Sequence, residues 1–480
     1  MVAKVSHLEN DSARIEAMQR IHIAQQRAHR HDPMPTAASR IENLRKLRKA
    51  VLEYRDELVE AINQDFGNRS RDESLLAEIM PSVGGIDHNI KHVRQWMKPS
   101  RRKVGMQFAP AKARVEYQPV GVVGVIVPWN YPVYLAIGPL TAALAAGNRV
   151  MIKMSEFTPN TAEVVEKLIS ATFDEDHVAV ITGEVEVAAA FSSLAFDHLL
   201  FTGSTSVGRH VMRAAADNLT PVTLELGGKS PAIISDSVPM RDAVERMSFG
   251  KMVNAGQTCV APDYVLCPRQ RVDEFIDTLR ATLARMYPTL ADNSDYTSII
   301  NPRQFERLLA VMQDARDKGA ELVELNPAAE DLAAAGKIAP HVVLNAGDDM
   351  QVMQDEIFGP LLPVIPYDTL DEAIAFINDR PRPLALYYFD YDRRRIRHVL
   401  DRTHSGGVCI NDTLSHVAQD DLPFGGTGPS GMGHYHAREG FLTFSHARGI
   451  FERPRFNSMR MAYPPYGRFI HRMIYKLFLR

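Results

Sequence analysis

Cysteine is scarce in this chain of 480 residues, with only Cys259, Cys267 and Cys409. Their spacing fits neither a Cys-x-x-Cys metal motif nor a disulfide framework, so a disulfide-stabilised secreted fold is excluded and a reducing, cytoplasmic compartment is expected. Cys267 and Cys409 lie in apolar runs typical of buried strands, where a thiol packs as a small hydrophobic group. Cys259 follows small and polar residues in "NAGQTCV", so it is either packing or a reactive thiol.

An excess of charge of one sign is also lacking. The 55 lysines and arginines nearly balance the 58 aspartates and glutamates, for a net charge of -3. A chain without a global basic field is not expected to bind nucleic acid. The N-terminal segment carries charge throughout and has no continuous apolar core, so it does not have the pattern of a secretory signal.

A long uninterrupted hydrophobic run is missing as well. Residues 117–148 contain no charged side chain, but prolines divide the segment into pieces shorter than the ~20 apolar residues that span a bilayer. These prolines are Pro119, Pro128, Pro132 and Pro139. The segment is therefore expected to form a buried strand, a loop and a helix.

Strand and helix patterns alternate through the middle of the chain. A charged helical start comes first, with Ser39 as the expected cap of a helix over residues 40–66. Buried strands are expected at 121–128, 149–155, 177–183 and 197–203, and helices at 134–147, 160–173, 186–194 and 206–218. This alternation predicts a parallel, doubly wound α/β sheet, which binds ligands at the carboxyl ends of its strands. A second α/β series is expected to start near residues 221–236 and to continue to 406–411.

Two glycine patterns compete as a phosphate-binding turn. "GTGPSG", residues 426–431, matches Gly-x-Gly-x-x-Gly, but no buried strand precedes it and Pro429 interrupts the helix that should follow. "FTGSTSVG", ending at Gly208, fails the strict pattern yet lies between a strand and a helix. The first turn of that helix could bind a pyrophosphate.

Two polar residues at strand ends have both structural and chemical interpretations. Glu225, in "VTLELGGKSP", is either a capped or salt-bridged glutamate or a desolvated carboxylate with a raised pKa that acts as a general base. Asn130, in "VPWNYP", is either a turn residue or a donor to an oxyanion.

Six motifs occur in an order that resembles the aldehyde dehydrogenase superfamily: "PWN", "FTGSTSVG", "LELGGKSP", "NAGQTC", "EIFGP" and "LPFGG". The resemblance covers essentially the whole chain. "PWNYP", "GQTCVAPDYVLC" and "SGMGHYH" are similar to the class 3 branch, and "DFGNRS" and "PPYG" to its bacterial coniferyl aldehyde dehydrogenases.

The fold implied by this resemblance is two doubly wound α/β domains with a small β element for oligomerisation or bridging. The implied division is a nucleotide-binding domain over 1–99 and 123–226, a catalytic domain over 227–409, the β element over 100–122 and 410–450, and a tail over 451–480.

The resemblance also implies roles for individual residues. Cys259 would attack the aldehyde, Asn130 and the Cys259 N–H would hold the oxyanion, and Glu225 would activate the water that hydrolyses the thioester. Cofactor contacts are implied at Trp129, Lys153, Ser155, Glu156, Gly203, Ser204, Thr205, Ser206, Val207, Gly208, Glu356 and Phe358.

The nature of the cofactor and of the substrate follows from the same resemblance. Glu156 would repel a 2'-phosphate and so favours NAD over NADP, although Lys153 could offset that repulsion. Tyr131 and residues 74–85 are expected to line the path of an aromatic or medium-chain aldehyde. The rival functions are a coenzyme A-acylating dehydrogenase, against which Glu225 argues, and a non-catalytic binding or structural protein.

Late histidines raise the question of a metal site. His404, His416, His434 and His436 lack the accompanying cysteine or carboxylate spacing of a metal motif, so no metal is expected.

The last residues predict an amphipathic helix. After Gly467, apolar residues recur on one helical face beside basic residues at successive i+4 steps. Such a helix either packs on its own or the partner subunit, or lies on an anionic membrane surface. A homodimer is expected from the resemblance, with contacts from Asn411 onward.

Overall fold

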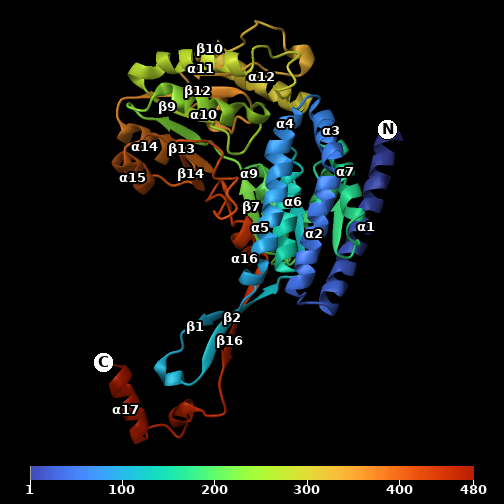
Figure 1. Cartoon of the computed structure of the whole chain (residues 1–480), viewed down its shortest axis with the longest axis vertical. Helices are drawn as coiled ribbons and strands as arrows, with labels where there is room; N and C mark the ends of the chain where they lie inside the picture. The colour runs from blue at the N-terminus through green and yellow to red at the C-terminus, as the bar shows by residue number, and fades with distance from the viewer. Residues whose placement is uncertain (1, 480) are drawn as a thin grey trace.

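Two sheets form the body of the molecule and a narrow arm projects from it, as Figure 1 shows for the computed structural model, which describes residues 2–479. The six-stranded sheet has the order β15-β7-β6-β3-β4-β5 and is parallel except for β15. Its strands are β3 (Val122–Ile126), β4 (Arg149–Lys153), β5 (Val178–Ile181), β6 (His198–Gly203), β7 (Val222–Leu226) and β15 (Gly431–Met432). The doubly wound parallel sheet predicted from the sequence is confirmed.

Helices cover both faces of this sheet. They are α6 (Tyr134–Ala146), α7 (Pro159–Ser170), α8 (Val185–Ser192) and α9 (Thr205–Ala216), and each lies where a helix is predicted. Helix α6 buries nearly every side chain because it packs against both the sheet and the N-terminal helices. It ends at Gly147, whose φ of 92° and close approach to the Arg40 guanidinium both require a residue without a side chain.

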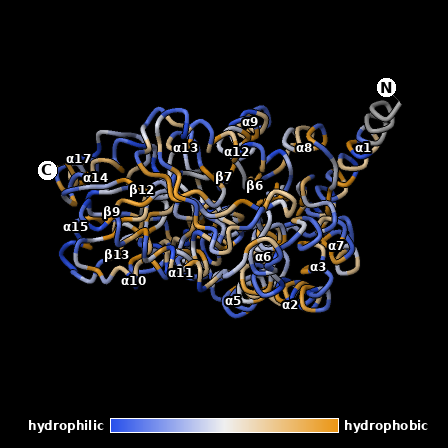
Figure 2. The backbone as a smooth tube through the Cα atoms, turned by 90° about the horizontal axis from the view of Figure 1, so that it is seen from above, coloured by the Kyte–Doolittle hydropathy of each residue, from blue (hydrophilic) through white to orange (hydrophobic). Residues whose placement is uncertain are grey.

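The second sheet has seven strands in the order β10-β11-β12-β9-β8-β13-β14 and is parallel except for β10. Its strands are β8 (Pro231–Ile234), β9 (Tyr264–Pro268), β10 (Glu321–Glu324), β11 (His341–Leu344), β12 (Leu361–Tyr367), β13 (Ala385–Phe389) and β14 (Gly407–Ile410). Its helices are α10 (Met240–Met252), α11 (Val272–Met286), α12 (Pro302–Asp317), α13 (Gln351–Gln354), α14 (Leu370–Asn378) and α15 (Arg393–Arg402). Seen from above, hydrophobic strand segments lie inside each lobe and hydrophilic turns lie outside (Figure 2).

The boundary between the two sheets corrects one sequence-based expectation. The second α/β series is predicted to start near residue 221, but β7 pairs in parallel with β6 and so belongs to the first sheet. The second sheet starts at β8. Strands β7 and β8 are both short, largely apolar runs, separated by a segment that contains Gly227 and Gly228. The sequence therefore does not show that the chain passes from the first sheet to the second between them.

The N-terminal helices correct a second expectation from the sequence. Helix α1 (Val2–His31) is followed by α2 (Ala37–Glu53) and α3 (Arg55–Phe66), so the single helix predicted over 40–66 is interrupted at Tyr54. The cap of α2 is Thr36, whose hydroxyl accepts the N–H of Ser39, and Ser39 is not the cap. Both residues suit an N-cap, and the extended backbone at Thr36 decides between them.

The N-terminal region continues with α4 (Arg71–Ser74), a π-helical turn η1 (Leu75–Ile79) and α5 (Met80–Trp96). Helix α5 packs against α2 and α6, and α16 (Ala437–Thr443) returns late in the chain to pack on α6 and α5. The late segment thereby reaches the helices that cover the first sheet.

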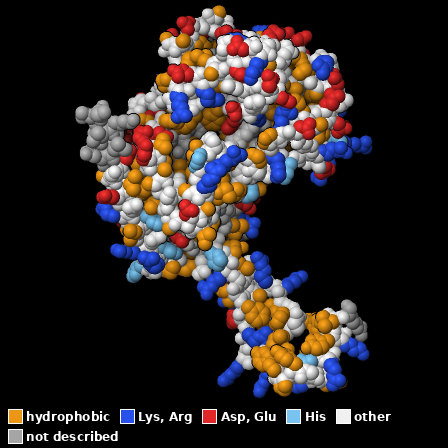
Figure 3. Space-filling model, turned by 180° about the vertical axis from the view of Figure 1, so that it is seen from behind, with side chains coloured by type: hydrophobic (Ala, Val, Ile, Leu, Met, Phe, Trp, Pro, Cys, Tyr) orange, Lys and Arg blue, Asp and Glu red, His pale blue; other side chains and the backbone are white. Residues whose placement is uncertain are grey.

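The arm is a three-stranded antiparallel sheet of β1 (Ser100–Arg102), β2 (Lys112–Pro119) and β16 (Ser445–Glu452), in the order β1-β2-β16. Beyond it lies α17 (Phe469–Phe478), which confirms the predicted terminal helix. Its apolar side chains do not pack on the body, since Phe469 is 75% and Leu477 67% exposed, and Figure 3 shows hydrophobic side chains gathered at the tip. No helix among residues 2–479 is long and apolar enough to cross a membrane.

Candidate active site

The sequence-predicted site residues meet where the carboxyl edge of the six-stranded sheet faces the second sheet. Asn130 follows β3, Glu156 follows β4, and Glu225 lies on β7. In the second sheet, Cys259 precedes β9 and Glu356 precedes β12. The amino ends of these second-sheet strands therefore face the edge at which a doubly wound sheet binds its ligand.

The loop before Cys259 has a strained backbone. Asn254, Ala255 and Gly256 have φ values of 53°, 50° and 77°, so three consecutive residues lie in the left-handed region. A side chain at Gly256 would come within 2.3 Å of the Gly359 carbonyl oxygen. The Gln257 amide stabilises the loop, because it donates to the Ser298 carbonyl and accepts from Ile300 N–H. Strain of this kind persists only where the surroundings enforce it, and it is common at functional sites.

The Cys259 thiol is held in its protonated form by its surroundings. Burial, together with the carboxyl groups of Glu356 and Glu225, raises the pKa of the thiol to about 12. The backbone N–H groups of Cys259 and Val260 approach the sulfur and partly oppose this shift of the pKa. A nucleophilic Cys259 must therefore give its proton to a base as it attacks.

Glu225 has the properties of a general base. The residue is 3% exposed, and neither carboxylate oxygen has a hydrogen-bond partner among the described residues. Burial raises the pKa of this carboxyl group well above its ordinary value. Glu225 takes part in none of the ion pairs of residues 2–479, so its salt-bridged interpretation is wrong.

Asn130 is fixed next to the cysteine loop. Its Nδ2 donates to the Gln257 carbonyl at 3.2 Å, and its backbone carbonyl accepts from Asn254 Nδ2 at 3.1 Å. An amide nitrogen has two N–H groups, so the second N–H of Asn130 is left for another acceptor. The loop after β3 and the loop before Cys259 are thus joined by hydrogen bonds in both directions.

Three charged residues behind these loops were not predicted as a cluster from the sequence: the buried Arg69 and Glu78, and the partly buried Glu73. We call them the Arg69 cluster. Arg69 donates to Glu78 at 2.9 Å, to Glu73 at 3.1 Å and to the Asn130 carbonyl at 3.0 Å. Glu73 accepts from Asn254 N–H. A run such as "NRSRDES" usually forms a solvated helix face, so only the tertiary packing identifies these charges as supports of the site.

The turn from β6 to α9 fits a pyrophosphate. Side chains added at Gly203 and Gly208 would come within 2.5 Å of the Phe201 ring and 2.7 Å of Leu226, so both positions need glycine. Ser204 caps α9 with its hydroxyl toward Val207 N–H, and the first turn is exposed. Thr205 and Ser206 supply the free N–H groups that a helix presents at its start.

The two charged side chains at the end of β4, Lys153 and Glu156, have different surroundings. Lys153 Nζ donates to the carbonyls of Met154 and Gly183, both at 2.7 Å, and the side chain is buried. Two of its three ammonium N–H groups therefore donate to the backbone. Glu156 is partly exposed beside it, and Ser155 accepts the N–H of Phe157.

Glu356, Phe358 and Trp129 lie together near Cys259. Glu356 Oε1 is shielded from solvent and has no partner among the described residues, and burial raises the pKa of this carboxyl group to about 8. The Phe358 and Trp129 rings meet edge to face at 5.2 Å. An orphaned carboxylate oxygen beside an aromatic pair suits a ribose hydroxyl with its attached ring, so these residues fit a nicotinamide nucleoside.

The remaining candidates do not build a second site. "GTGPSG" follows no strand and leads into β15, which pairs with β7 at Glu225. His416 and His436 are buried, and burial lowers the pKa of each to about 4. Residues 2–479 contain no cluster of three or more potential metal ligands.

Comparisons with known proteins agree with this geometry. The model of the aldehyde dehydrogenase family matches residues 3–450. The chain is 60% identical to the "probable coniferyl aldehyde dehydrogenase" of Pseudomonas aeruginosa, over the full length of both, and 49% identical to the "coniferyl aldehyde dehydrogenase" of a Pseudomonas species, over 91% of each.

Solved structures give the same result for the fold. The substrate-bound state of Staphylococcus aureus AldH superposes with a TM-score of 0.91 at 37% identity, covering 96% of this chain and 99% of that one. Betaine aldehyde dehydrogenase from Staphylococcus aureus, solved in complex with NAD+, superposes with a TM-score of 0.82 at 28% identity, covering 91% of this chain and 88% of that one. Because this related structure contains NAD+, it supports a nicotinamide cofactor for the present chain.

Proposed function

Because the chain belongs to the aldehyde dehydrogenase family, we propose that it oxidises an aromatic aldehyde of the coniferyl type to the carboxylic acid, with Cys259 as nucleophile and Glu225 as base. Aldehyde oxidation with a nicotinamide cofactor is the activity of the family. The identity of the aldehyde and the roles of the residues are the proposal.

One observation carries the assignment of roles. A buried carboxylate without any partner, Glu225, lies close enough to a protonated thiol, Cys259, to raise the pKa of that thiol. A carboxylate in such a place costs stability and is retained where its basicity is used. Cys267 and Cys409 are buried in strands and offer no comparable arrangement.

The first step is addition to the carbonyl. Cys259 Sγ bonds to the aldehyde carbon while the thiol proton passes to solvent water. The carbonyl oxygen becomes an oxyanion, which accepts hydrogen bonds from the second N–H of Asn130 Nδ2 and from the Cys259 backbone N–H. The network that holds Asn130 in place keeps this donor oriented before substrate arrives.

The second step converts the adduct into a thioester and then into the acid. The nicotinamide cofactor supplies a hydride acceptor when it is bound. The carbon attached to Cys259 loses the hydride and becomes an acyl group. Glu225 then removes a proton from water, the water oxygen bonds to the acyl carbon, and the Cys259 thiolate leaves. In the overall reaction, the aldehyde, the oxidised cofactor and water give the acid, the reduced cofactor and a proton.

Residues of the β4 and α9 turns favour NAD over NADP. Glu156 would accept a hydrogen bond from a free 2'-hydroxyl and repel a 2'-phosphate. Lys153, the residue that could offset this repulsion, has its ammonium bound to two backbone carbonyls. The exposed N–H groups at Thr205 and Ser206 would bind the pyrophosphate.

Hydrolysis is favoured over transfer of the acyl group to coenzyme A. The acylating reaction has no use for a base that activates water, whereas Glu225 is buried and unpartnered beside the thiol. A non-catalytic role is disfavoured by the same pair of residues.

A homodimer is proposed from two open sheet edges. Among the described residues, β14 pairs only with β13, and β16 pairs only with β2, so each has one free edge that a second copy can pair with. The exposed apolar and basic face of α17 is proposed to add weak association with anionic membranes. The cytoplasmic compartment and the domain boundaries remain predictions.

Purified protein tests the proposed activity directly. With NAD and coniferyl aldehyde, we expect NADH to form without coenzyme A, faster than with NADP or with a straight-chain aldehyde of similar size. Turnover that requires coenzyme A, or faster oxidation of the straight-chain aldehyde, would contradict the proposal.

A further inference from the structure

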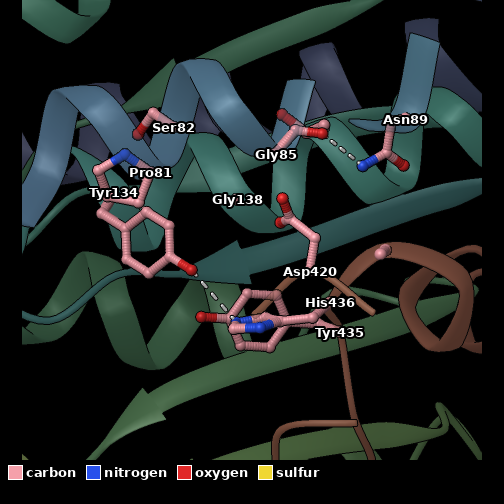
Figure 4. Close-up of a pocket in the computed structure, with 11 residues that line it drawn as sticks. Pro81, Ser82, Gly85, Asn89, Tyr134, Gly138, Asp420, Tyr435 and His436 are labelled. Carbon is pink, nitrogen blue, oxygen red and sulfur yellow. Dashed lines mark hydrogen bonds between the residues drawn. The ribbon is translucent and has the colours of Figure 1, made fainter. Parts of the chain in front are cut away.

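The charged contacts that the mechanism above does not use surround residues 352–358, which lead into β12 and carry Glu356 and Phe358. We call these residues the Glu356 segment. The pocket between α5, α6 and residues 420–437 (Figure 4) lies elsewhere. It has room for about one water molecule, and its lining includes no residue of the reaction centre, so no site is assigned to it.

Three neighbouring strands of the second sheet bring these charged contacts together. Strands β8, β9 and β12 are parallel and adjacent, in the order β12-β9-β8. Parallel neighbours have their amino ends at the same edge of a sheet. Lys229 precedes β8, Asp263 precedes β9, and the Glu356 segment precedes β12. The topology therefore places them side by side, although they are far apart in the sequence.

Lys229 and Asp263 hold the backbone of the Glu356 segment. The Lys229 ammonium pairs with Asp263 Oδ2 and donates to the Asp355 carbonyl at 3.0 Å. Asp263 Oδ1 accepts the N–H of Ile357 at 3.0 Å. Both charged side chains are largely shielded from solvent, with 12% and 4% exposed, so water screens their pairing only weakly. The pair thus holds the residue on each side of Glu356.

Arg307 adds a third contact, from α12. Its Nη2 donates to the Ile357 carbonyl at 2.7 Å, and its Nε donates to the Gln304 side chain at 2.7 Å. The next residue, Phe358, has a φ of 49°, in the left-handed region that a residue with a side chain rarely adopts. Strained backbone persists only where its surroundings enforce it. The contacts to the segment therefore fix the conformation that presents Phe358.

The same contacts connect the segment to both proposed reacting residues. Lys229 lies four residues after Glu225, in the turn between β7 and β8, and Asp263 lies four residues after Cys259, at the start of β9. The Asp263 N–H also donates to the Ser230 carbonyl at 2.7 Å, which joins these two parts of the chain directly. A displacement of the segment would therefore change its distance from both the nucleophile and the base.

The Glu356 carboxylate lies against the turn after β7. A side chain at Gly227 would come within 1.8 Å of Glu356 Oε2, whereas Oε1 has no partner among the described residues. Burial, together with Asp263, raises the pKa of the Glu356 carboxyl group to about 8, and Lys229 and Arg307 oppose that rise. The two cations thus favour the ionised carboxylate, which is the form that accepts hydrogen bonds from hydroxyl groups.

We propose that Lys229, Asp263 and Arg307 are positioning residues for the nicotinamide end of the cofactor. They fix the segment so that Glu356 and Phe358 hold the nicotinamide ribose and its ring next to the nucleophile. The inference rests on the proposed function and on the fit of Glu356 and Phe358 to a nicotinamide nucleoside. The proposed contacts to the adenosine and the pyrophosphate lie on the first sheet, so a displaced segment is expected to affect only one end of the cofactor.

The experiment compares the binding of NAD with that of ADP, which lacks the nicotinamide riboside, by calorimetry. Lys229→Met is expected to weaken NAD binding by about tenfold, as for the loss of one hydrogen bond to a charged group, and to change ADP binding by less than about twofold. Arg307→Met leaves the Lys229–Asp263 pair intact and is expected to act in the same direction. It decides the test if Lys229→Met does not fold.

The rate of hydride transfer gives a second measurement. At saturating NAD, the first equivalent of NADH is expected to form about tenfold to a hundredfold more slowly in both variants, because a small misplacement of reacting groups has an effect of this size. Stopped-flow absorbance measures this phase. Since NAD is saturating, the slower phase reports the position of the bound cofactor and not its affinity.

Lys318→Met is the matched control. Lys318 likewise donates to a backbone carbonyl, that of Asp349 at 2.6 Å, and pairs with Asp314 at 2.8 Å, but Asp349 precedes the segment. The control is expected to keep both NAD binding and the rate of the first phase. Unchanged NAD binding and an unchanged first phase in Arg307→Met, or an equal effect in Lys318→Met, would overturn the proposal.

The binding measurement separates this proposal from the proposed function. If no aldehyde is oxidised, the proposed function fails, and the comparison of NAD with ADP still tests the segment because it needs no substrate. A loss of affinity confined to NAD in the Lys229 and Arg307 variants supports the positioning role. An equal loss for NAD and ADP contradicts it.

Discussion

Two buried carboxylates near the catalytic loops have opposite surroundings. In the Arg69 cluster, Glu78 Oε1 accepts from Arg69, and its Oε2 accepts from the N–H groups of Val133 and Tyr134. At the reaction centre, Glu225 is equally shielded but neither oxygen has a partner among residues 2–479. The first carboxylate stabilises the loops, whereas the second is left able to bind a proton. Burial alone therefore does not identify a candidate acid or base, and it is the lack of a described partner on both oxygens that distinguishes Glu225 from Glu78.

Removal of the nucleophile is expected to have the largest effect. Cys259→Ala should lower kcat by at least about 10⁴-fold, because no other group in the site can form the covalent adduct. NAD binding, measured by fluorescence titration, should persist because its contacts lie on other residues. Cys267→Ala is the control, and it should retain activity. A Cys259→Ala enzyme with a tenth of the original activity would remove Cys259 from the mechanism.

Glu225→Gln removes the carboxylate at the reaction centre. If Glu225 acts as the base for hydrolysis, the variant should release about one equivalent of NADH rapidly and then turn over about 10²- to 10⁴-fold more slowly. Stopped-flow absorbance separates the two phases. Loss of the rapid phase itself would place Glu225 in the attack step rather than in hydrolysis.

Glu78→Gln removes the carboxylate that pairs with Arg69 in the Arg69 cluster. The substitution leaves Arg69 buried with a weakened partner, so we expect a loss of up to about 3–5 kcal/mol in the free energy of unfolding, measured in guanidinium chloride. Glu57→Gln, at the exposed pair with Lys167, is the matched control and should change little. If the two variants lose equal stability, the Arg69 cluster does not support the loops.

The pH dependence of stability sharpens the same contrast. Burial raises the folded-state pKa of Glu225 above its ordinary value of 4.5, so the folded state binds the proton more tightly than the unfolded state. Relative to Glu225→Gln, the unmodified enzyme should therefore lose stability as the pH rises from 4.5 toward the raised pKa. If the free energies of unfolding of the unmodified enzyme and of Glu225→Gln change in parallel with pH across that range, the pKa of Glu225 is not raised.

The smallest effect is expected at the other end of the molecule, in the tail. A form that ends at Tyr466 should keep its kcat, because α17 lies beyond the arm and away from the two large sheets. At low salt, the full chain should co-sediment weakly with anionic vesicles, and the shortened form should not. Equal recovery of both forms in the supernatant would eliminate the membrane association.

Local sequence signals predicted much of the fold and the reacting residues. Apolar runs and their turns located β3, β4, β5 and β6 and the helices between them, because these elements obey a local period. The motifs around Asn130, Glu225 and Cys259 indicated the site through their resemblance to the aldehyde dehydrogenase superfamily, whereas the local chemistry of each residue alone left two interpretations open. The geometry adds that their loops are joined by hydrogen bonds.

The features that were missed depend on contacts between distant segments. No sequence pattern singled out Arg69, and Glu78 belongs to the segment 74–85 that was expected to line the substrate path. Their pairing beneath the Asn130 loop depends on tertiary packing. The choice of Thr36 over Ser39 as a cap depends on backbone conformation, which two similar residues do not reveal in sequence.

The central claim is that Cys259 carries the acyl group and Glu225 releases it. It is tested most directly by mass spectrometry of the Glu225→Gln variant after reaction with NAD and coniferyl aldehyde. We predict a covalent acyl adduct on the peptide that contains Cys259, in about one equivalent per chain, and no adduct in the double variant with Cys259→Ala. An adduct on Cys267 or Cys409, or an unmodified protein after a full equivalent of NADH has formed, would contradict the account.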